Sequence, residues 1–524
     1  MTICRIGEIS LSLDTLEGDV CVIGAGAAGL FVARRLADQG RDVILLESGL
    51  AIAMSSVEAG FEVDCRLQAY GGAVEGRSFG LGGTTSRWGG QLIPYSKFDL
   101  EGRDPVMALA WKRILDVVAV RKDAVGAILG LGISRESPLG LEEERLKRPL
   151  EQQLAKAGLP LARSVWLPFS RRNMKFLAGG ATAEQGMRVY LDATASGWKL
   201  VRSTSGLGKA VSLTVRSRDG RSLSVSAKHF VIAAGAIEST RILFELNTAG
   251  ATPVLPVKSA LGIGLSDHLS VPVALIDPSD RHSARKVLAP TFADGLMHSL
   301  RIPLRYRAPD EPAGFAHFVA TDPGPGFELA RTMLQGLQAH RLPQLPMKLL
   351  LGGTLGLATV GWDRIVRSRL HVDRSAQWRI QLDLEQNPRS TNKIVMGNRR
   401  DAWNRLVPEV WWCVDEADQA SVKRVTERLF SKIRVASTVF EDLVPIDCDA
   451  SFSKPYDTYH PVGTCRMGED EAAVVDLDLT VRGTSNVSMI STALFPSAGT
   501  ANPTFSLLCL ADELAGRIER VLHQ

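Results

Sequence analysis

The chain has 524 residues, of which 45% are hydrophobic and 23% are charged, a composition typical of globular proteins and a length too great for one ordinary core. Roughly two to four domains are expected at this length. The 61 basic and 57 acidic residues give a formal net charge of +4, which is close to balance and gives no indication of a nucleic-acid partner.

The cysteines and the first residues indicate a cytoplasmic location. The pattern holds no C-x-x-C, and an odd number of scattered cysteines is typical of reduced thiols in a cytosolic compartment. The first residues, MTICRIGEISLSLDTLEGD, carry acidic side chains and no long apolar run, which is untypical of a signal peptide. The seven cysteines are Cys4, Cys21, Cys65, Cys413, Cys448, Cys465 and Cys509.

The first clear set of elements lies in residues 19–49, DVCVIGAGAAGLFVARRLADQGRDVILLESG. VCVIG predicts a short buried strand, and a helix is expected over about Ala27–Gln39, with Leu30, Ala33 and Leu36 on its buried side. DVILLE predicts a second strand that ends at Glu47.

The turn between this strand and helix predicts a dinucleotide site. Gly24, Gly26 and Gly29 have G-x-G-x-x-G spacing, which permits a tight turn and a close approach of the backbone to a pyrophosphate. The helix N-terminus then supplies free N–H groups and positive dipole. Glu47 lies where a carboxylate can accept hydrogen bonds from ribose hydroxyls. FAD and NAD both carry ADP, so this motif does not distinguish them.

A second glycine-rich stretch, RSFGLGGTTSRWGGQLIP at 77–94, favours FAD. A flavin ring lies far from the adenine and needs a second backbone cradle. Gly80, Gly82 and Gly83 leave room for a flat ring or a phosphate, and the hydroxyl groups of 84–86 can donate hydrogen bonds. Taken alone, the stretch could equally be a surface loop, whereas together with the first motif it predicts a flavin loop.

The middle of the chain predicts further elements of the same domain. Residues 142–158 predict an amphipathic helix whose charges face solvent. KAVSLTVRSRDGRSLSVSA at 209–227 predicts two strands around Asp219-Gly220. HFVIAAGAIESTRILFEL then predicts another buried strand, a turn at 234–236 and a helix, which would bring a second strand–turn–helix unit against the dinucleotide, although a purely structural role is open.

Residues 270–455 predict a second domain. Prolines, aromatic residues and long strand-like runs such as QWRIQLDLEQNP at 377–388 favour a largely antiparallel sheet that covers the cofactor. The apolar segment 349–362 is too short to span a bilayer and predicts a buried helix or lid segment. Basic residues around it keep a peripheral membrane contact through 325–370 open.

The C-terminal part holds the candidate catalytic residues. Asn502 and Pro503 predict a helix start, with a buried stripe of Leu507, Leu510, Leu514 and Ile518; its N-terminus would stabilise negative charge on a reduced flavin. His460, in TYHPVGTCRMG, has the side chain suited to taking a hydroxyl proton, and the Asn502 amide can hold the same oxygen. The residues alone also leave a structural histidine open.

The motifs together resemble the glucose–methanol–choline (GMC) oxidoreductase family. GAGAAG with Glu47, GLGGTTSRWGG, VIAAGAIESTRIL, GIGLSDHL, YHPVGTCRMG, VVDLDLTVRGTSNV and FPSAGTANPTFSL occur in family order between about 19 and 520. The resemblance implies an α/β fold, with a Rossmann-like FAD-binding domain of GMC type and a second α+β substrate domain built on a largely antiparallel sheet. We assign 16–100, 190–270 and 456–524 to the FAD-binding domain, and 101–189 and 271–455 to the substrate-binding cap.

The resemblance also implies residue roles. His460 falls on the family's catalytic histidine and Asn502 on its second catalytic position. Arg87 stands where some members link the flavin to a histidine, so non-covalent FAD is expected, with Arg87 near the ring or a phosphate. No metal is expected. The residues expected to bind the cofactor are Gly24, Gly26, Ala27, Ala28, Gly29, Glu47, Ser48, Gly82, Gly83, Thr84, Thr85, Arg87, Trp88, Gly89, Gly90, Ala234, Gly235, Pro503 and Thr504.

The implied function is oxidation of an alcohol group by proton abstraction and hydride transfer to flavin N5. Trp88 in the flavin loop and GTANPT are similar to pyranose oxidases and to sugar- and gluconate-type dehydrogenases, which favours a sugar or glycoside as substrate. Oxygen, a quinone or another redox carrier would accept the electrons, and a homo-oligomer is left open. The alternatives are a membrane-peripheral dehydrogenase of a non-sugar alcohol that reduces a quinone or cytochrome, a lyase that retains FAD without redox use, and an NAD enzyme.

Overall fold

The structure is a computed structural model, and it describes most of the chain. The described residues are 2–10, 14–131, 149–179, 186–202, 206–276, 281–304, 311–322, 324–340, 342–343, 345–373, 375–447 and 458–523.

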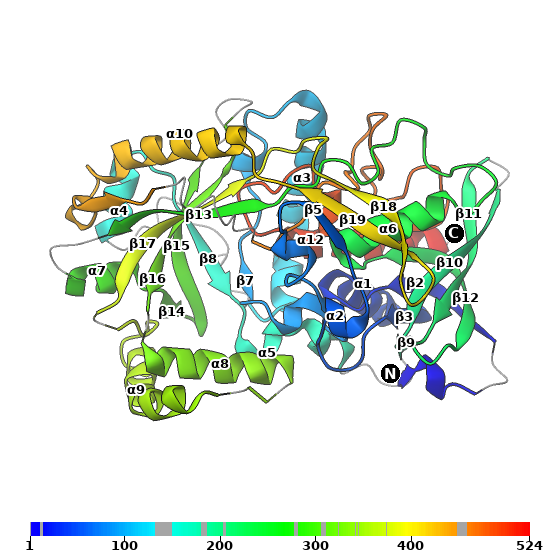
Figure 1. The fold of residues 1–524 in the computed structure, drawn as a ribbon, viewed down its shortest axis with the longest axis horizontal. Helices are drawn as coiled ribbons and strands as arrows, with labels where there is room; N and C mark the ends of the chain where they lie inside the picture. Colours follow the sequence, from blue (N-terminus) through cyan, green and yellow to red (C-terminus); the bar gives the residue numbers. More distant parts are fainter. Residues whose placement is uncertain are drawn as a thin grey trace.

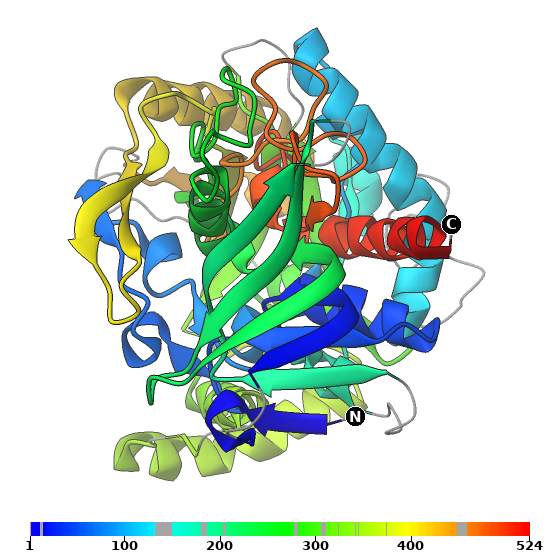
Figure 2. The same cartoon turned by 90° about the vertical axis from the view of Figure 1, so that its right-hand side faces the viewer.

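Two large sheets lie side by side, as Figure 1 shows, with helices between and around them. The first has the strand order β1-β9-β3-β2-β12-β11-β10, and β21 also pairs with β12. The pairs from β1 to β12 are parallel, whereas β12, β11 and β10 form an antiparallel meander, which Figure 2 shows face on. The strands are β1 Thr2–Arg5, β2 Thr15–Ile23, β3 Val43–Glu47, β9 Met187–Leu191, β10 Thr194–Arg202, β11 Gly208–Arg216, β12 Ser222–Ile232 and β21 Val487–Met489.

The helices of this half pack against one another as well as on the sheet. All residues of β3 are buried, as expected for a parallel strand covered on both faces. Helix α12 packs against both α1 and α3, and the three helices contribute to one large core with the strands. The helices are α1 Ala27–Asp38, α3 Pro105–Ile128, α6 Gly235–Asn247 and α12 Pro503–His523.

The predicted elements of this half are largely confirmed. Helix α1 begins at Ala27, Gln39 is its C-cap, and the expected side is buried. Helix α12 begins at Pro503 and buries the four predicted stripe residues. The predicted hairpin forms between β11 and β12. One expectation is wrong: the strand expected from 229 is the continuation of β12, which runs unbroken from Ser222 to Ile232.

The second sheet is antiparallel, as predicted for the second domain. Its strand order is β20-β13-β17-β16-β15-β8-β7, with β14 paired to β15. Its apolar side chains form a second core together with α10. The elements are β7 Gln91–Leu92, β8 Ala162–Trp166, β13 His268–Ile276, β14 Thr291–Ala293, β15 Leu296–Leu304, β16 Gly314–Thr321, β17 Gln377–Glu385, β20 Leu443–Pro445 and α10 Glu416–Ile433.

Smaller elements complete the fold. A three-stranded sheet, β18-β19-β5, contributes Ile394, Val410 and Trp412 to the second core, and a two-stranded sheet, β4-β6, is also present. Helices α8 and α9 pack against each other at the edge of the second half, below β14 in Figure 1. The bounds are α2 Ser56–Ala59, α4 Pro149–Lys156, α5 Phe169–Arg172, α7 Arg281–Leu288, α8 Pro325–Ala339, α9 Met347–Ile365, β4 Met54–Ser55, β5 Asp64–Leu67, β6 Ser78–Phe79, β18 Lys393–Arg400 and β19 Leu406–Trp412.

Two expectations about helices need correction. Of the helix expected over 142–158, residues 142–148 lie outside the described residues, and within α4 the charge of Glu151 is not on a wetted face: it is buried and paired with Arg163 at 2.8 Å. The segment 349–362 is helical within α9 but is not buried, since Leu351 is 70% exposed. Within the described ranges, no helix combines the length and apolar character that crossing a bilayer requires.

The domain boundaries stay a prediction. Helix α3 packs in the core of the first sheet, although the predicted division assigns 101–189 to the cap, whereas β8, from the same range, pairs in the second sheet.

His229 on β12 makes stability depend on pH. Its Nε2 lies 3.0 Å from Ser488 Oγ, and burial lowers the histidine pKa to about 4. At pH values between about 4 and about 6.5, this histidine is protonated in the unfolded chain but not in the folded chain. The folded state is therefore favoured above about pH 6.5, and this contribution is lost as the pH falls.

We expect His229→Gln to remove this term. The measurement is the free energy of unfolding in urea at pH 7.5 and at pH 5. The decrease from pH 7.5 to pH 5 should be smaller in the variant than in the natural chain, by about 2 kcal/mol. Equal losses in both proteins would contradict the assignment. The exposed His523→Ala serves as a control in which no difference is expected.

Candidate active site

A cavity of about 660 Å³ brings together segments that are far apart in the chain. The turn before α1, the end of β3, the predicted flavin loop at 77–94 and the turn before α6 line it. His268 and Asp383 from the second sheet, and His460 and Asn502 from the C-terminal part, also line it. The cavity therefore lies where the two halves of the molecule meet.

The glycine turn before α1 has the shape that a pyrophosphate requires. Gly24 has φ +105°, and a Cβ there would lie 2.6 Å from the Ala233 carbonyl oxygen. Gly26, the N-cap of α1, makes no side-chain cap hydrogen bond, and a Cβ on it would meet no protein atom within 4 Å. Space for a ligand thus adjoins the uncapped N–H groups of a helix N-terminus.

Glu47 has capacity left for a ribose hydroxyl. Its carboxylate accepts hydrogen bonds from the backbone N–H groups of Ala25, Gly49 and Gly80 at 2.8–2.9 Å. A carboxylate offers about four acceptor positions, so one remains for a ligand on the cavity side. Burial raises the carboxyl pKa, although the three N–H groups oppose this.

The loop at 77–94, which lines the cavity, is held in a compact form. Its centre is a 3₁₀ turn, Gly83–Ser86, which follows Gly82 in a left-handed conformation. Thr85 Oγ1 donates to the Gly82 carbonyl at 2.5 Å. From α8, Gln338 Nε2 lies 2.9 Å from the Thr85 and Trp88 carbonyl oxygens and donates to them.

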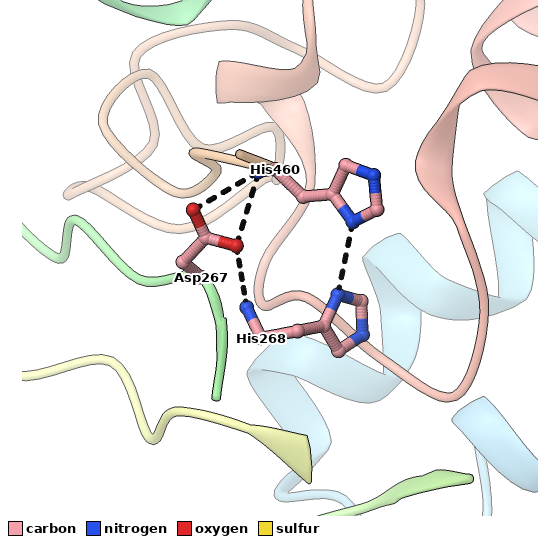
Figure 3. Close-up of side chains that lie close together, drawn as sticks. All are labelled: Asp267, His268 and His460. Atoms are coloured by element: carbon pink, nitrogen blue, oxygen red, sulfur yellow. Dashed lines mark hydrogen bonds between the residues drawn. The ribbon is translucent and has the colours of Figure 1, made fainter. Parts of the chain in front are cut away.

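His460 is fixed at the cavity by Asp267, which the sequence analysis did not single out. The Asp267 carboxylate accepts from the backbone N–H of His460 at 3.0 Å and from that of His268 at 2.7 Å, as Figure 3 shows. It also accepts from Tyr70 Oη at 2.7 Å and from Thr458 Oγ1 at 3.1 Å. A single buried carboxylate thus holds the backbone of both histidines.

The hydrogen bonds around His460 determine which ring nitrogen carries its proton. The Gly499 carbonyl oxygen can only accept, so His268 Nε2, at 2.9 Å, donates to it and His268 Nδ1 carries a lone pair. This lone pair lies 3.3 Å from His460 Nδ1, which therefore carries the proton. Thr458 Oγ1, which donates to Asp267, accepts at 2.9 Å from the same nitrogen. His460 Nε2 is left with a lone pair.

Both histidines are neutral near pH 7. Burial, reinforced by the neighbouring His268, lowers the pKa of His460 to about 3, and burial also lowers the pKa of His268. Asp267, His268 and His460 place potential metal-ligand atoms within 4.8 Å of one another. The Asp267 oxygens, both His268 ring nitrogens and His460 Nδ1 are all engaged in hydrogen bonds, whereas His460 Nε2 keeps its lone pair.

The loop before α12 positions Asn502. Thr500 donates from its backbone N–H and its hydroxyl to Asp99, and the Gly499 N–H donates to Glu385 at 2.9 Å. Glu385 is paired with Arg103 at 2.8 Å, and both side chains are almost fully buried. Burial opposes the ionisation of Glu385, yet Arg103 and the hydrogen bonds hold its pKa below the ordinary value. Breaking such a buried pair costs roughly 3–5 kcal/mol, so the loop is firmly held.

The structure brings nearly all predicted site residues to the cavity. His460 and Asn502 both line it, and Asn502 Nδ2 donates to Gln91 Oε1 at 3.4 Å. Of the predicted cofactor residues, Gly29 and Gly82 do not line it: a Cβ on Gly29 would lie 1.9 Å from the Gly24 carbonyl oxygen, so this glycine allows the helix to pack on the turn. The others line the cavity: Gly24, Gly26, Ala27, Ala28, Glu47, Ser48, Gly83, Thr84, Thr85, Arg87, Trp88, Gly89, Gly90, Ala234, Gly235, Pro503 and Thr504.

Sequence reasoning missed several polar and aromatic residues of the cavity. His268 stands in the quoted motif GIGLSDHL, but no role was assigned to it. Asp383 and Trp166 lie within or at the end of strands, where nothing in the pattern distinguishes them from structural residues. The further polar and aromatic lining residues include Phe61, Glu75, Arg77, Gln91, Trp166, Glu238, Arg241, His268, Asp383, Thr458 and Tyr459.

Comparison with known families gives two matches. Residues 19–297, just over half of the chain, match the family described as FAD dependent oxidoreductase. Residues 388–511 match GMC oxidoreductase.

Individual relatives agree with these matches. An uncharacterized GMC-type oxidoreductase of Mycobacterium tuberculosis is 24% identical over 94% of this chain and 75% of its own length. Alcohol dehydrogenase [acceptor] of Pseudomonas putida is 42% identical, but over only 12% of this chain. The match covers just 11% of the length of that dehydrogenase. A match to an oxygen-dependent choline dehydrogenase of Chromohalobacter salexigens also covers 11% of the length of that protein.

Solved structures share the fold. Formate oxidase of Aspergillus oryzae has a TM-score of 0.59 at 15% identity, with 97% of this chain and 99% of that chain covered. Pyridoxine 4-oxidase from Mesorbium loti has a TM-score of 0.56 at 17% identity, with 96% and 99% covered.

Gly26→Val tests the cradle. The added side chain would occupy the open space beside the uncapped N-terminus of α1, so the variant should lose most of its flavin while staying folded. The absorbance at about 450 nm per mole of desalted protein measures this. Gly361→Val is the matched control, because a Cβ there also meets no atom within 4 Å. Full flavin content in Gly26→Val would contradict the assignment.

Proposed function

We propose, from the premise that this chain belongs to the FAD dependent oxidoreductase family and has a C-terminal part of GMC oxidoreductase type, that it oxidises an alcohol group of a small molecule. FAD is the cofactor, and the glycine turn with open space, the uncapped helix N-terminus and the buried Glu47 fit it. The sequence comparison with curated alcohol and choline dehydrogenases supports the substrate class.

The observation that carries the proposal is the protonation state of His460. When bound, FAD supplies the acceptor for the hydride that leaves the alcohol carbon. The remaining task for the protein is to take the hydroxyl proton, which needs a neutral base with its lone pair facing the substrate. His460 fits this role, because burial keeps its imidazole neutral near pH 7, its Nδ1 is occupied by Thr458 and His268, and its Nε2 keeps a lone pair in a residue that lines the cavity.

Asn502 completes the proposed catalytic pair. Its carboxamide lines the same cavity and can donate to the alcohol oxygen without carrying charge. The side chain projects from the start of α12, and the N-terminal dipole of that helix favours negative charge in the cavity. Asn502 therefore holds the oxygen while His460 removes its proton.

The cavity favours a substrate with several hydroxyl groups, such as a sugar or glycoside. Asp383 faces it as a carboxylate: burial alone would raise its pKa, but His317, Arg301 and Ser270 hold it well below the ordinary value. Gln91 adds an amide and Trp166 an aromatic face. Carboxylate and amide groups bind neighbouring hydroxyls, and an indole packs on the apolar face of a sugar ring.

A non-redox lyase would use the same base. An anaerobic panel of sugars, glycosides and simple alcohols separates the two functions, because only an oxidoreductase bleaches the flavin absorbance. Peroxide formed during turnover identifies oxygen as the electron acceptor, and its absence favours a quinone or another redox carrier.

His460→Ala should slow flavin reduction by roughly two to four orders of magnitude, because the hydroxyl proton loses its acceptor. Anaerobic stopped-flow absorbance with the best substrate of the panel measures the rate, at equal flavin content. His523→Ala, the same change at an exposed site at the end of α12, should leave the rate unchanged. A near-normal rate in His460→Ala would remove His460 from the role.

FAD should be bound without a covalent link to the loop at 77–94. Arg87, at the position of the linking histidine in some members of the family, cannot form that bond, and it lines the cavity as an exposed side chain. Acid precipitation should therefore leave a colourless pellet and a yellow supernatant. Colour that stays with the pellet would contradict non-covalent binding.

A further inference from the structure

Helices α8 and α9 pack on each other as a hairpin that is apolar on its inner side and on an exposed outer side. On the inner side, Gly326 of α8 and Gly356 of α9 lie so close that a Cβ on either would meet the other within 3 Å. A Cβ on Gly353 would likewise lie 2.7 Å from the Leu329 side chain. The glycines therefore let the two backbones approach closely, and the inner faces are satisfied by each other.

The outer face of α9 is also apolar, and it is exposed. Met347, Leu351, Ala358, Trp362 and Ile365 recur at helical spacing and share one side of the helix. Leu351 is 70% exposed, Trp362 58% and Ile365 80%. Exposed large apolar side chains also occur on α8, in the connection between the helices and just past α9, and the full set is Met333, Leu334, Leu337, Leu342, Met347, Leu351, Trp362, Ile365 and Val366. We call these nine residues the hairpin surface.

The charge around the hairpin surface is positive. Residues 325–370 hold six basic and two acidic residues, a net charge of +4, which equals the formal net charge of the whole chain. One of the two acids, Asp363, is buried and bound by Arg367 at 2.8 Å and His371 at 2.7 Å. Glu328 is the other and is exposed. The basic residues are Arg331, Lys348, Arg364, Arg367 and Arg369, together with Arg341, which lies outside the described residues.

We propose that the hairpin surface docks onto an anionic lipid surface. Leucine, methionine and tryptophan side chains flanked by Lys and Arg are what a helix lying in the headgroup region of a bilayer presents, and each cation adds attraction to anionic lipid. A second copy of the chain fits less well, because pairing the same surface would bring two groups of net +4 together. No described helix is suited to spanning a bilayer, so the contact is peripheral.

The docking surface is connected to the cofactor site. Gln338, at the end of α8, is buried and donates through one carboxamide to two carbonyl oxygens of the loop at 77–94. Asn173 Nδ2 in turn donates to the Gln338 carbonyl at 2.9 Å. The hairpin is thus anchored to the loop that lines the cavity.

Sedimentation with vesicles tests the proposal. The flavin-loaded protein should bind vesicles that contain both phosphatidylglycerol and phosphatidylcholine. It should bind much more weakly to vesicles of phosphatidylcholine alone. Leu351→Glu with Ile365→Glu should abolish binding to both. Arg331→Gln with Lys348→Gln should weaken binding to the anionic vesicles by about 25-fold, since each cation contributes about fivefold. Raised salt should weaken it in the same direction.

Val120→Glu with Val435→Glu is the matched control, because both valines are exposed large hydrophobic residues outside the hairpin surface. This control should bind vesicles like the natural chain, and unchanged flavin content and melting temperature in every variant show that the fold is intact. Absence of vesicle binding by the natural chain overturns the proposal. So does a natural chain that is a dimer in sedimentation velocity and becomes monomeric in Leu351→Glu with Ile365→Glu, since the surface would then be a subunit interface.

Discussion

The loop at 497–502 holds the two halves of the molecule in register around the cavity. The backbone N–H groups of Thr500 and Gly499 donate hydrogen bonds to two buried carboxylates, Asp99 and Glu385, respectively. Glu385 belongs to the sheet of the second half. The Gly499 carbonyl oxygen of the same loop accepts a hydrogen bond from His268 Nε2, and His268 lies on a neighbouring strand of that sheet. The loop leads into α12, which packs in the first core. Any shift between the halves would therefore strain buried charged hydrogen bonds, which are costly to leave unmade.

This arrangement explains how a histidine can be both buried and ready to accept a proton. Burial alone makes imidazole neutral but leaves open which nitrogen carries the proton. Here the Gly499 carbonyl determines the tautomer of His268, and His268 in turn determines the tautomer of His460. The hydrogen bond to Thr458, which is bound to Asp267, favours the same tautomer. The second half of the molecule thus contributes more than a cover for the cavity, because it sets the state of the proposed base.

The sequence allowed prediction of those parts of the site that are local. The glycine turn, Glu47 and the start of α12 depend on neighbours within a few residues, and all were placed correctly. His268 and His460 are 192 positions apart, and their contact depends on how β13 meets the C-terminal loops, which no local pattern records. Asp383 follows the alternation of an ordinary strand, so its charge at the cavity could not be recognised. Segment 349–362 was expected to be a buried helix or a lid segment because it is apolar, but whether a neighbouring element covers an apolar helix is decided by the rest of the fold.

The carboxamide of Gln338 joins the molecular surface to the interior through two hydrogen bonds to one loop. Free energies of binding at linked sites are reciprocal: if binding at the outer surface changed the affinity of the loop for its ligand, that ligand would change the affinity of the outer surface by the same factor. Saturating the interior site would then change how tightly the exterior is held. Gln338, an uncharged side chain, would in this way link the occupancy of the cavity to the affinity of the outer surface for its partner.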